Sequence, residues 1–186
     1  MNEIMSQKAA SLFDDIGKWN AFLELYNLKD RIIDQWNSRL IEALEKTIVF
    51  DVDKWKFRKW QSKSWGWHTG EDPGSLVILY ENNNFCLWID GARYDTNQIV
   101  DTFREQKIFS GFFRPSEILK NNSYLAIRKN AISIHNLTNP DLLAWHAGKD
   151  TSESKLLYDE LHRFFSFFML DPEIYGMILD INKVLR

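Results

Sequence analysis

Five of the eight tryptophans in this chain lie between Trp55 and Trp88, and four of those crowd into residues 55–67. A tryptophan cluster usually marks either a protein core or a contact surface, because the indole ring buries a large area. Lysine and arginine alternate with the aromatic rings in this stretch, which is the period-two pattern of a β-strand. The cluster therefore predicts an aromatic-rich sheet.

A strand over residues 54–60 places Trp55 and Phe57 on one side. The other side then carries Lys54, Lys56, Arg58 and Trp60. Two interpretations stay open. In the first, the basic side binds a macromolecular partner, and the predicted contact residues are Lys56, Arg58, Trp60, Lys63 and Trp65. In the second, Trp55, Trp65 and Trp67 fill a core between sheet and helices, and the lysines are solvated.

Composition indicates an ordinary folded chain. With 45% hydrophobic and 15% aromatic residues it can build a sizeable core, and 186 residues suggest one domain. The net charge of −3 recruits neither nucleic acid nor a membrane surface. The charge separates into bands, with an excess of +3 over residues 51–70, −5 over 71–101 and +4 over 102–149. Such bands either neutralise one another in the fold or form a dipolar surface.

Cys86 is the only cysteine, which excludes an internal disulfide and any zinc site that needs several thiolates. Its apolar neighbours Phe85, Leu87 and Trp88 suggest a strand interior and an inert buried thiol. The N-terminus lacks the pattern of a secretory signal, and no apolar run is long enough to span a membrane. We therefore expect a cytoplasmic protein without a membrane partner and without a cofactor.

The order of patterns predicts a single α+β domain over residues 1–186. Residues 1–47 are helical in pattern, 52–135 are mainly sheet with a helix near 96–107, and 140–186 are helical. The expected fold has N-terminal helices, a central antiparallel β-meander of about four to six strands, and C-terminal helices packed on the sheet.

Within the N-terminal part, apolar residues spaced three and four apart run from Leu12 to Tyr26 and again from Ile33 to Leu44. Lys29 and Asp30 interrupt this stripe. The pattern predicts either two helices or one helix with a polar gap. A sustained coiled coil is not expected, because the gap falls in the seam.

The strands of the meander are predicted at 54–60, 63–68, 75–80 and 85–89. A further strand or short hairpin is expected within residues 124–134, and a short helix within 140–147. Asp95 and Asp171 are placed to cap the helices that follow them. Over residues 152–170 the expected core-facing stripe is Leu157, Leu161, Phe164 and Phe168.

No phosphate-binding glycine loop and no nucleophile motif is present. None of the four histidines, His68, His135, His146 and His162, pairs with another at the spacing of a helical zinc site. His68 ends the tryptophan-rich segment, and with Glu71 or Asp90 it forms a weak candidate for an enzyme site. We therefore predict no catalytic residue and no metal ligand.

Asp141, Glu153 and Lys155 trace the outline of a PD-(D/E)xK metal-dependent nuclease site. That chemistry needs the two carboxylates on adjacent strands with the lysine nearby. Glu153 and Lys155 open a predicted helix instead, where residues two apart point in different directions. A second acidic set, Glu81, Asp90 and Asp95, could hold a cation, but Asp90 precedes a glycine as in a turn and Asp95 serves as a helix cap.

These features favour a non-enzymatic cytoplasmic interaction protein that binds a macromolecular partner, first of all another protein. Inhibition or neutralisation of that partner would place it with immunity-type or counter-defence proteins, by analogy of class. The alternative is a nucleic-acid-associated protein, including a relative of the PD-(D/E)xK nucleases, with the basic residues on phosphates and Trp60 or Trp65 on bases. The sequence does not set the oligomeric state.

Overall fold

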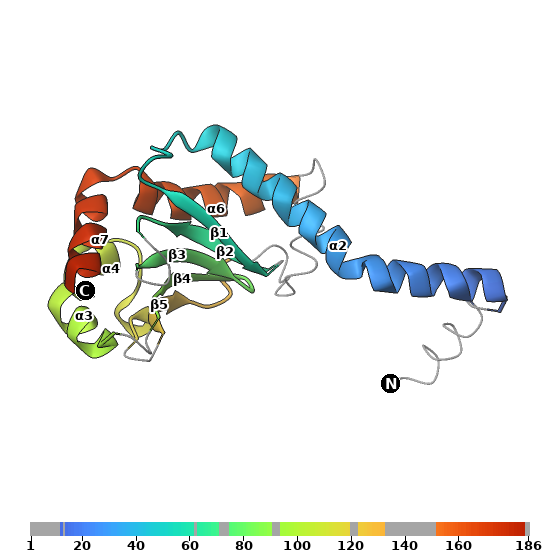
Figure 1. Cartoon of the computed structure of the whole chain (residues 1–186), viewed down its shortest axis with the longest axis horizontal. Coiled ribbons are helices and arrows are strands. Elements are labelled where there is room, and N and C mark those ends of the chain that lie inside the picture. Colours follow the sequence, from blue (N-terminus) through green and yellow to red (C-terminus); the bar gives the residue numbers. More distant parts are fainter. Residues whose placement is uncertain are drawn as a thin grey trace.

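The computed structural model describes Leu12 and residues 14–61, 63–70, 75–90, 94–119, 123–132 and 152–184, without the side chain of Glu153. Over these residues the predicted α+β fold is confirmed, with a helix first, an antiparallel sheet next and helices last (Figure 1). The elements are α2 (Ile16–Thr47), β1 (Lys56–Gln61), β2 (Ser64–His68), β3 (Val77–Glu81), β4 (Asn84–Trp88), α3 (Thr96–Phe103), α4 (Lys107–Ser110), η1 (Pro115–Glu117), β5 (Tyr124–Arg128), α6 (Ser152–Met169) and α7 (Pro172–Val184).

The five strands form one sheet in which strand order equals chain order and every neighbour is antiparallel. The four predicted strands are present, and β5 is the expected fifth. Between β3 and β4 the chain turns at Asn82 and Asn83, whose φ angles are 47° and 64°. Two consecutive positive φ angles are typical of a two-residue hairpin turn, and asparagine tolerates them better than most residues.

Alternation along the strands gives the sheet an inner face, covered by helices, and an outer face. The inner face presents Trp65, Trp67, Ile78, Tyr80, Phe85 and Leu87. The outer face presents Lys56, Arg58, Trp60, His68, Val77, Leu79, Cys86, Trp88, Tyr124 and Ile127.

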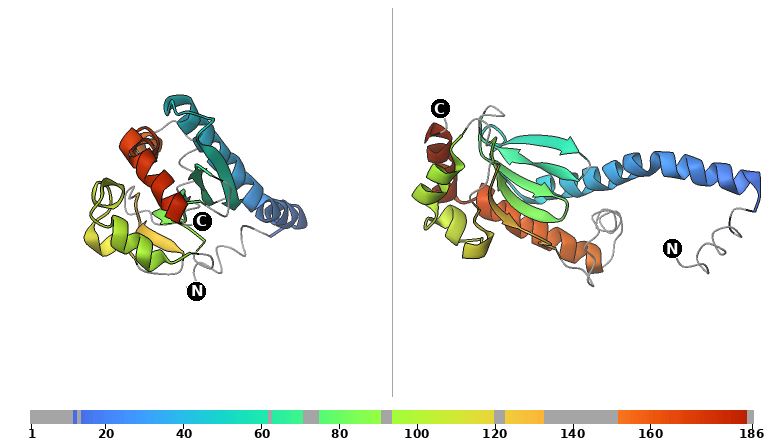
Figure 2. Two further views of the ribbon diagram at one scale, coloured as in Figure 1. Left: turned by 60° about the vertical axis from the view of Figure 1, so that its left-hand side comes forward. Right: turned by 90° about the horizontal axis from the view of Figure 1, so that it is seen from below.

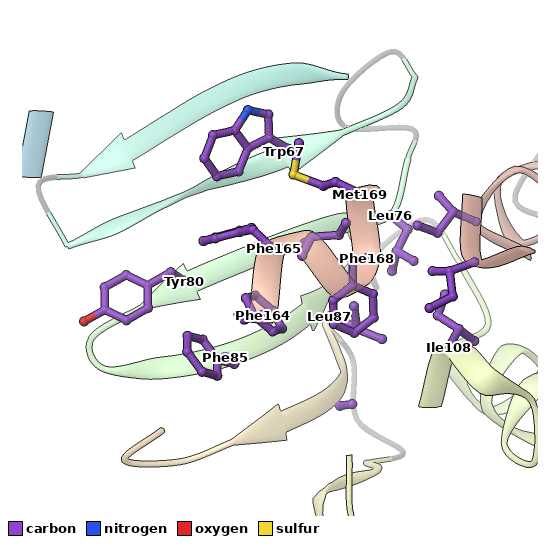
Figure 3. Close-up of a cluster of buried hydrophobic side chains, with 14 of the residues drawn as sticks. Trp67, Leu76, Tyr80, Phe85, Leu87, Ile108, Phe164, Phe165, Phe168 and Met169 are labelled. Carbon is purple, nitrogen blue, oxygen red and sulfur yellow. The ribbon is translucent and has the colours of Figure 1, made fainter. Parts of the chain in front are cut away.

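Helix α6 lies against the inner face and packs its phenylalanines on it (Figure 3). All four residues of its predicted stripe are buried, which confirms that prediction. The ring of Phe165 stacks on Trp65 with centroids 5.4 Å apart and meets Trp67 edge-on at 4.6 Å. The strand tryptophans and the phenylalanines of α6 therefore form one aromatic core.

Helix α7 follows directly and closes one end of the molecule (Figure 2). The carboxylate of Asp171 accepts hydrogen bonds from the backbone N–H groups of Glu173 and Ile174, as Asp95 does at the start of α3, so both predicted caps are confirmed. Asn182 accepts a bond from the Leu76 amide at 2.8 Å and donates one to Thr69, which ties α7 to the sheet.

From Ile16 to Leu44 the N-terminal stripe belongs to one continuous helix, α2, which decides in favour of one helix with a polar gap. Among the described residues, no helix is both long and apolar enough to cross a bilayer. The predicted helix over 140–147 lies outside the described residues, as do His135, His146, Asp141 and Glu71.

Candidate interaction surfaces

Strand β1 stands at the edge of the sheet, and its side chains are largely exposed. Lys56 and Arg58 point outward, and Lys63 lies in the turn before β2. Lysine on an edge strand also opposes unwanted strand pairing, because its charge resists burial. Two other basic residues of this stretch are held by acids: Lys59 by Asp34 of α2 at 2.8 Å, and Lys54 by Asp51 at 2.9 Å.

Trp55, Trp65 and Trp67 are buried, so the core interpretation is confirmed for these three residues. Trp65 is fully buried and does not belong to a partner-binding surface, contrary to its place among the predicted contact residues. The reason is the alternation within β2, which puts Trp65 on the same inner side as Trp67. Its indole N–H is bonded to no group of the described chain.

Trp60 is the tryptophan of β1, and its side chain lies on the outer face of the sheet. It meets Trp88 of β4 edge-on, with ring centroids 6.0 Å apart, and both rings are partly exposed. The guanidinium of Arg58 lies 4.9 Å from the centroid of Trp60. The rings pack against Val77, Leu79 and Cys86 in a second apolar cluster, whose described members all come from the sheet.

A polar contact crosses the same face. The hydroxyl of Tyr124 donates to Glu81 at 2.5 Å, and Ser64 donates to the other oxygen of that carboxylate at 3.1 Å. Burial, together with this bond to a carboxylate, raises the pKa of the Tyr124 phenol. Burial also raises the pKa of the Cys86 thiol, so the thiol stays protonated and unreactive.

His68 is almost fully buried at the end of β2. Its Nδ1 lies 2.8 Å from the carbonyl oxygen of Gly70 and 3.3 Å from the hydroxyl of Ser75. Because a carbonyl only accepts, Nδ1 carries the proton and is not a base for Ser75. Burial lowers the pKa of His68. Pairing through β3 places Asp90 at the same end of the sheet as His68. The Nδ1 atom of His68, however, is already engaged by Gly70 and Ser75.

No group of three or more metal-ligating side chains occurs within the described ranges. Lys155 and the backbone of Glu153 lie in the first turn of α6, as the sequence predicted. A strand-borne nuclease arrangement is therefore not formed by this pair.

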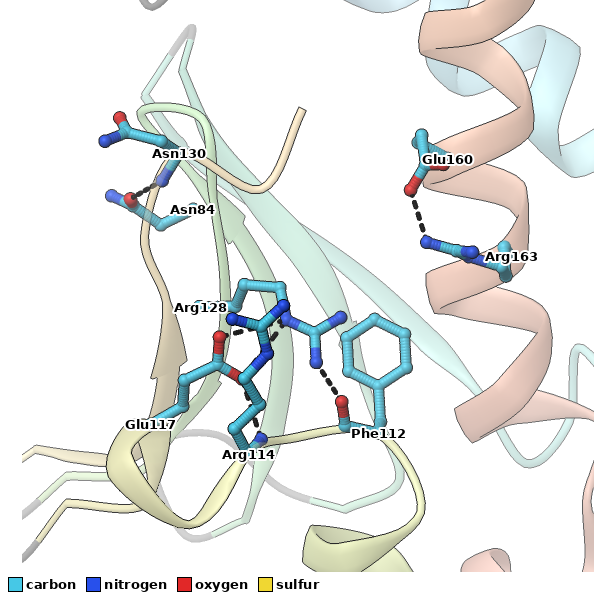
Figure 4. A network of polar contacts seen from close by, with 8 residues as sticks. All are labelled: Asn84, Phe112, Arg114, Glu117, Arg128, Asn130, Glu160 and Arg163. Carbon is cyan, nitrogen blue, oxygen red and sulfur yellow. Dashed lines mark hydrogen bonds and ion pairs between the residues drawn. The ribbon is translucent and has the colours of Figure 1, made fainter. Parts of the chain in front are cut away.

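A cavity of about 570 Å³ opens between the end of β5 and α6. Its cationic lining residues are Arg114, Arg128, Lys129 and Arg163. Two carboxylates oppose them, and both are engaged: Glu117 lies 3.2 Å from Nε of Arg128, and Glu160 lies 2.6 Å from Arg163 (Figure 4).

Arg128 is tied into the fold as well. It donates to the carbonyl of Phe112 and lies 4.2 Å from the centroid of that ring. Three cations of this cavity come from the basic band over residues 102–149. The band was visible in the sequence, but the chain reversals that gather it into one place were not.

The N-terminal half of α2 extends away from the sheet and the other helices (Figures 1 and 2). Every residue from 14 to 31 is exposed, and the first buried residue is Ile33. We call residues 16–31 the α2 arm. Its exposed large apolar side chains are Ile16 (75%), Trp19 (43%), Phe22 (37%), Leu23 (40%), Leu25 (61%), Tyr26 (66%) and Leu28 (42%). The stripe was visible in the sequence, but the exposure of its side chains was not.

Comparison with models of protein families, with curated proteins and with solved structures finds no match to this chain. The function is therefore inferred from these surfaces alone.

Proposed function

We propose that this protein is a non-enzymatic cytoplasmic protein that binds another protein through the β1 end of the outer sheet face. The contact residues in this proposal are Lys56, Arg58, Trp60 and Trp88. Neutralisation or inhibition of the partner stays a prediction.

The observation that carries the proposal is the partly exposed pair of Trp60 and Trp88 beside Arg58. Tryptophan and arginine are the residue types most enriched among interface hot spots, because they bury much area and also form polar contacts. A guanidinium over an indole is held in place before binding, which lowers the entropy lost on association. Lys56 and Arg58 add positive charge, so the matching partner surface carries Asp or Glu around an apolar anchor.

Nucleic acid is the weaker alternative for this face. Binding to a phosphate backbone needs many cations, and affinity rises with their number. Of the five basic residues in the stretch, Lys54 and Lys59 are already engaged by Asp51 and Asp34. The chain as a whole is acidic, with a net charge of −3.

The first experiment places a photo-crosslinking amino acid at position 56 in cells and identifies the captured protein by mass spectrometry. The partner is then purified, and its affinity is measured by calorimetry for the wild-type chain and for Trp60→Ala. We expect Trp60→Ala to weaken binding by about 2 kcal/mol, roughly 30-fold.

The matched controls are charge reversals of two exposed lysines. Lys56→Glu should weaken binding to an acidic partner, whereas Lys155→Glu, on α6, should not. Thermal unfolding of each variant separates binding from stability. Equal affinities for the wild-type chain, Trp60→Ala and Lys56→Glu would refute the proposal.

Binding to labelled DNA and RNA is measured in parallel at low and high salt. Affinity that falls steeply with salt would favour the nucleic-acid alternative. We also expect the purified chain to leave both nucleic acids intact in the presence of Mg²⁺ or Mn²⁺.

A further inference from the structure

We infer that the α2 arm is a self-association element: two copies of this chain pair through their arms, antiparallel, along the exposed apolar stripe. This inference uses the α2 arm and the two residues before it, and is independent of the outer sheet face.

The first argument is the helical phase of the stripe. Ile16, Trp19, Leu23 and Tyr26 are spaced three, four and three apart, which places them on one side of the helix. The same spacing continues after the polar gap into Ile33, Asn37, Leu40 and Leu44. All four of those residues are buried. The arm therefore extends the face of α2 that packs against the rest of the fold, beyond the point where that fold ends.

The second argument is size. At a rise of about 1.5 Å per residue, the arm extends for about 25 Å. Aromatic side chains bury about 150–250 Å² each, so two arms can remove on the order of 1,000 Å² from water. That is about the lower limit for a specific interface. A large apolar surface left exposed is a recognised mark of an association site.

The antiparallel direction follows from where the fold is attached. From Ile33 onward, the residues of α2 that are buried against the described part of the fold continue the stripe on the same side of the helix. Parallel pairing would bring the two folded bodies to the same place, whereas antiparallel pairing puts them at opposite ends. When the two apolar stripes are aligned in antiparallel, Ile16 of one copy lies opposite Tyr26 of the other, and Trp19 lies opposite Leu23.

Charge agrees with this register. Asp15 and Lys29 both flank the apolar stripe. In this register Asp15 of one copy lies near Lys29 of the other, and the two-fold symmetry repeats the pair. A lipid surface is a poorer occupant, because helices that lie on membranes are usually rich in Lys and Arg. Residues 14–31 hold three basic residues, Lys18, Lys29 and Arg31, against four acidic ones, Asp14, Asp15, Glu24 and Asp30.

The test measures the mass of the full chain in solution by light scattering over a range of micromolar concentrations. We expect a dimer for the wild type, a monomer for Leu23→Glu and a dimer for Leu25→Glu. Leu25 is the matched control, since it is the same residue type, is exposed to a greater extent and lies off the stripe. Helical circular dichroism confirms that both variants fold.

A wild-type chain that stays monomeric throughout would overturn the inference. So would equal dissociation of the two leucine variants, because the stripe would then not be the seam. Binding of the wild-type monomer to anionic vesicles would assign the stripe to a membrane instead.

The direction is tested by disulfide crosslinking of single cysteine variants in a Cys86→Ala background. Phe22→Cys lies near the two-fold axis and should crosslink, whereas Ile16→Cys should not. Efficient crosslinking of Ile16→Cys would show parallel arms and contradict the antiparallel register.

Discussion

Phe85 of β4 lies parallel to Phe164 of α6, with ring centroids 4.2 Å apart and an interplanar angle of 8°. Both rings are buried. This contact joins a central strand to the helix that covers it, so its loss should be felt across the whole core.

Phe164→Ala should lower the free energy of unfolding by about 3–5 kcal/mol, because it removes a fully buried ring and leaves a cavity. Leu156→Ala, on the exposed side of the same helix, should cost less than about 0.5 kcal/mol. Urea unfolding of the two variants checks the difference. Similar stabilities would mean that the α6 stripe does not face a core.

Two glycines predict opposite effects for the same substitution. A Cβ at Gly66 would clash with the backbone oxygen of Ile78 on the neighbouring strand, whereas one at Gly176 in α7 meets nothing within 4 Å. Gly66→Ala should destabilise by about 3 kcal/mol, because backbone atoms cannot move aside without breaking the sheet. Gly176→Ala should stabilise by about 0.5–1 kcal/mol by lowering the entropy of the unfolded chain. Melting temperatures that shift in the same direction would contradict this pair.

Asp171 both caps α7 and forms an ion pair with Lys107. The contribution of the ion pair to stability depends on pH, which allows it to be measured separately. A hydrogen bond from the ammonium group of Lys107, at 2.7 Å, holds the pKa of Asp171 below its ordinary value. The ionised form is thus favoured by folding, so the stabilisation is present above about pH 4 and is lost as the pH falls through the lowered pKa.

Asp171→Asn keeps an oxygen for the cap and removes the charge, so its deficit in melting temperature should be present at neutral pH and vanish in acid. Asp171→Ala should lose about 1 kcal/mol more at neutral pH, because the cap is also removed. A deficit of Asp171→Asn that stays constant with pH would exclude the ion pair as its cause.

His68 predicts a loss of stability in the same direction as Asp171, as the pH falls, but in a higher pH window. Because burial lowers its pKa, the unfolded chain takes up a proton near pH 6.5 while the folded chain resists. This group therefore makes the protein less stable as the pH falls from about 7 to about 5. His68→Asn removes the titration, so the fall in urea midpoint over that interval should be smaller than in the wild type. An unchanged fall would show that His68 does not contribute.

The sheet was predictable because its information is local. The apolar runs Ser75–Tyr80 and Phe85–Ile89, with only the polar residues 81–84 between them, indicate a hairpin without reference to the rest of the chain. Asp95 and Asp171 were predictable as caps for the same reason, since a cap bonds only to the next few backbone groups. Trp65 could have been assigned correctly from its own strand, because it shares a face with Trp67.

The candidate surfaces were less predictable, because exposure depends on what packs from far away in the sequence. The stripe from Ile16 to Tyr26 has the same period as the buried stripe beyond it, and only the position of α6 and the sheet separates them. The pairing of Trp60 with Trp88 likewise depends on the order of strands between them. Arg128 and Arg163 meet around one cavity only once β5 and α6 are in place.

The meander of strands also has a consequence for how the chain assembles as it is synthesised. Each strand pairs with the next one made, so the first four can associate by closing short loops, which is fast. Their aromatic inner face, however, is covered by α6, and the hydroxyl of Tyr158 in that helix bonds Thr47, 111 residues earlier. During synthesis this face should therefore stay exposed from the completion of β4 at Trp88 until α6 is made, and a chaperone that binds aromatic segments would act in that interval.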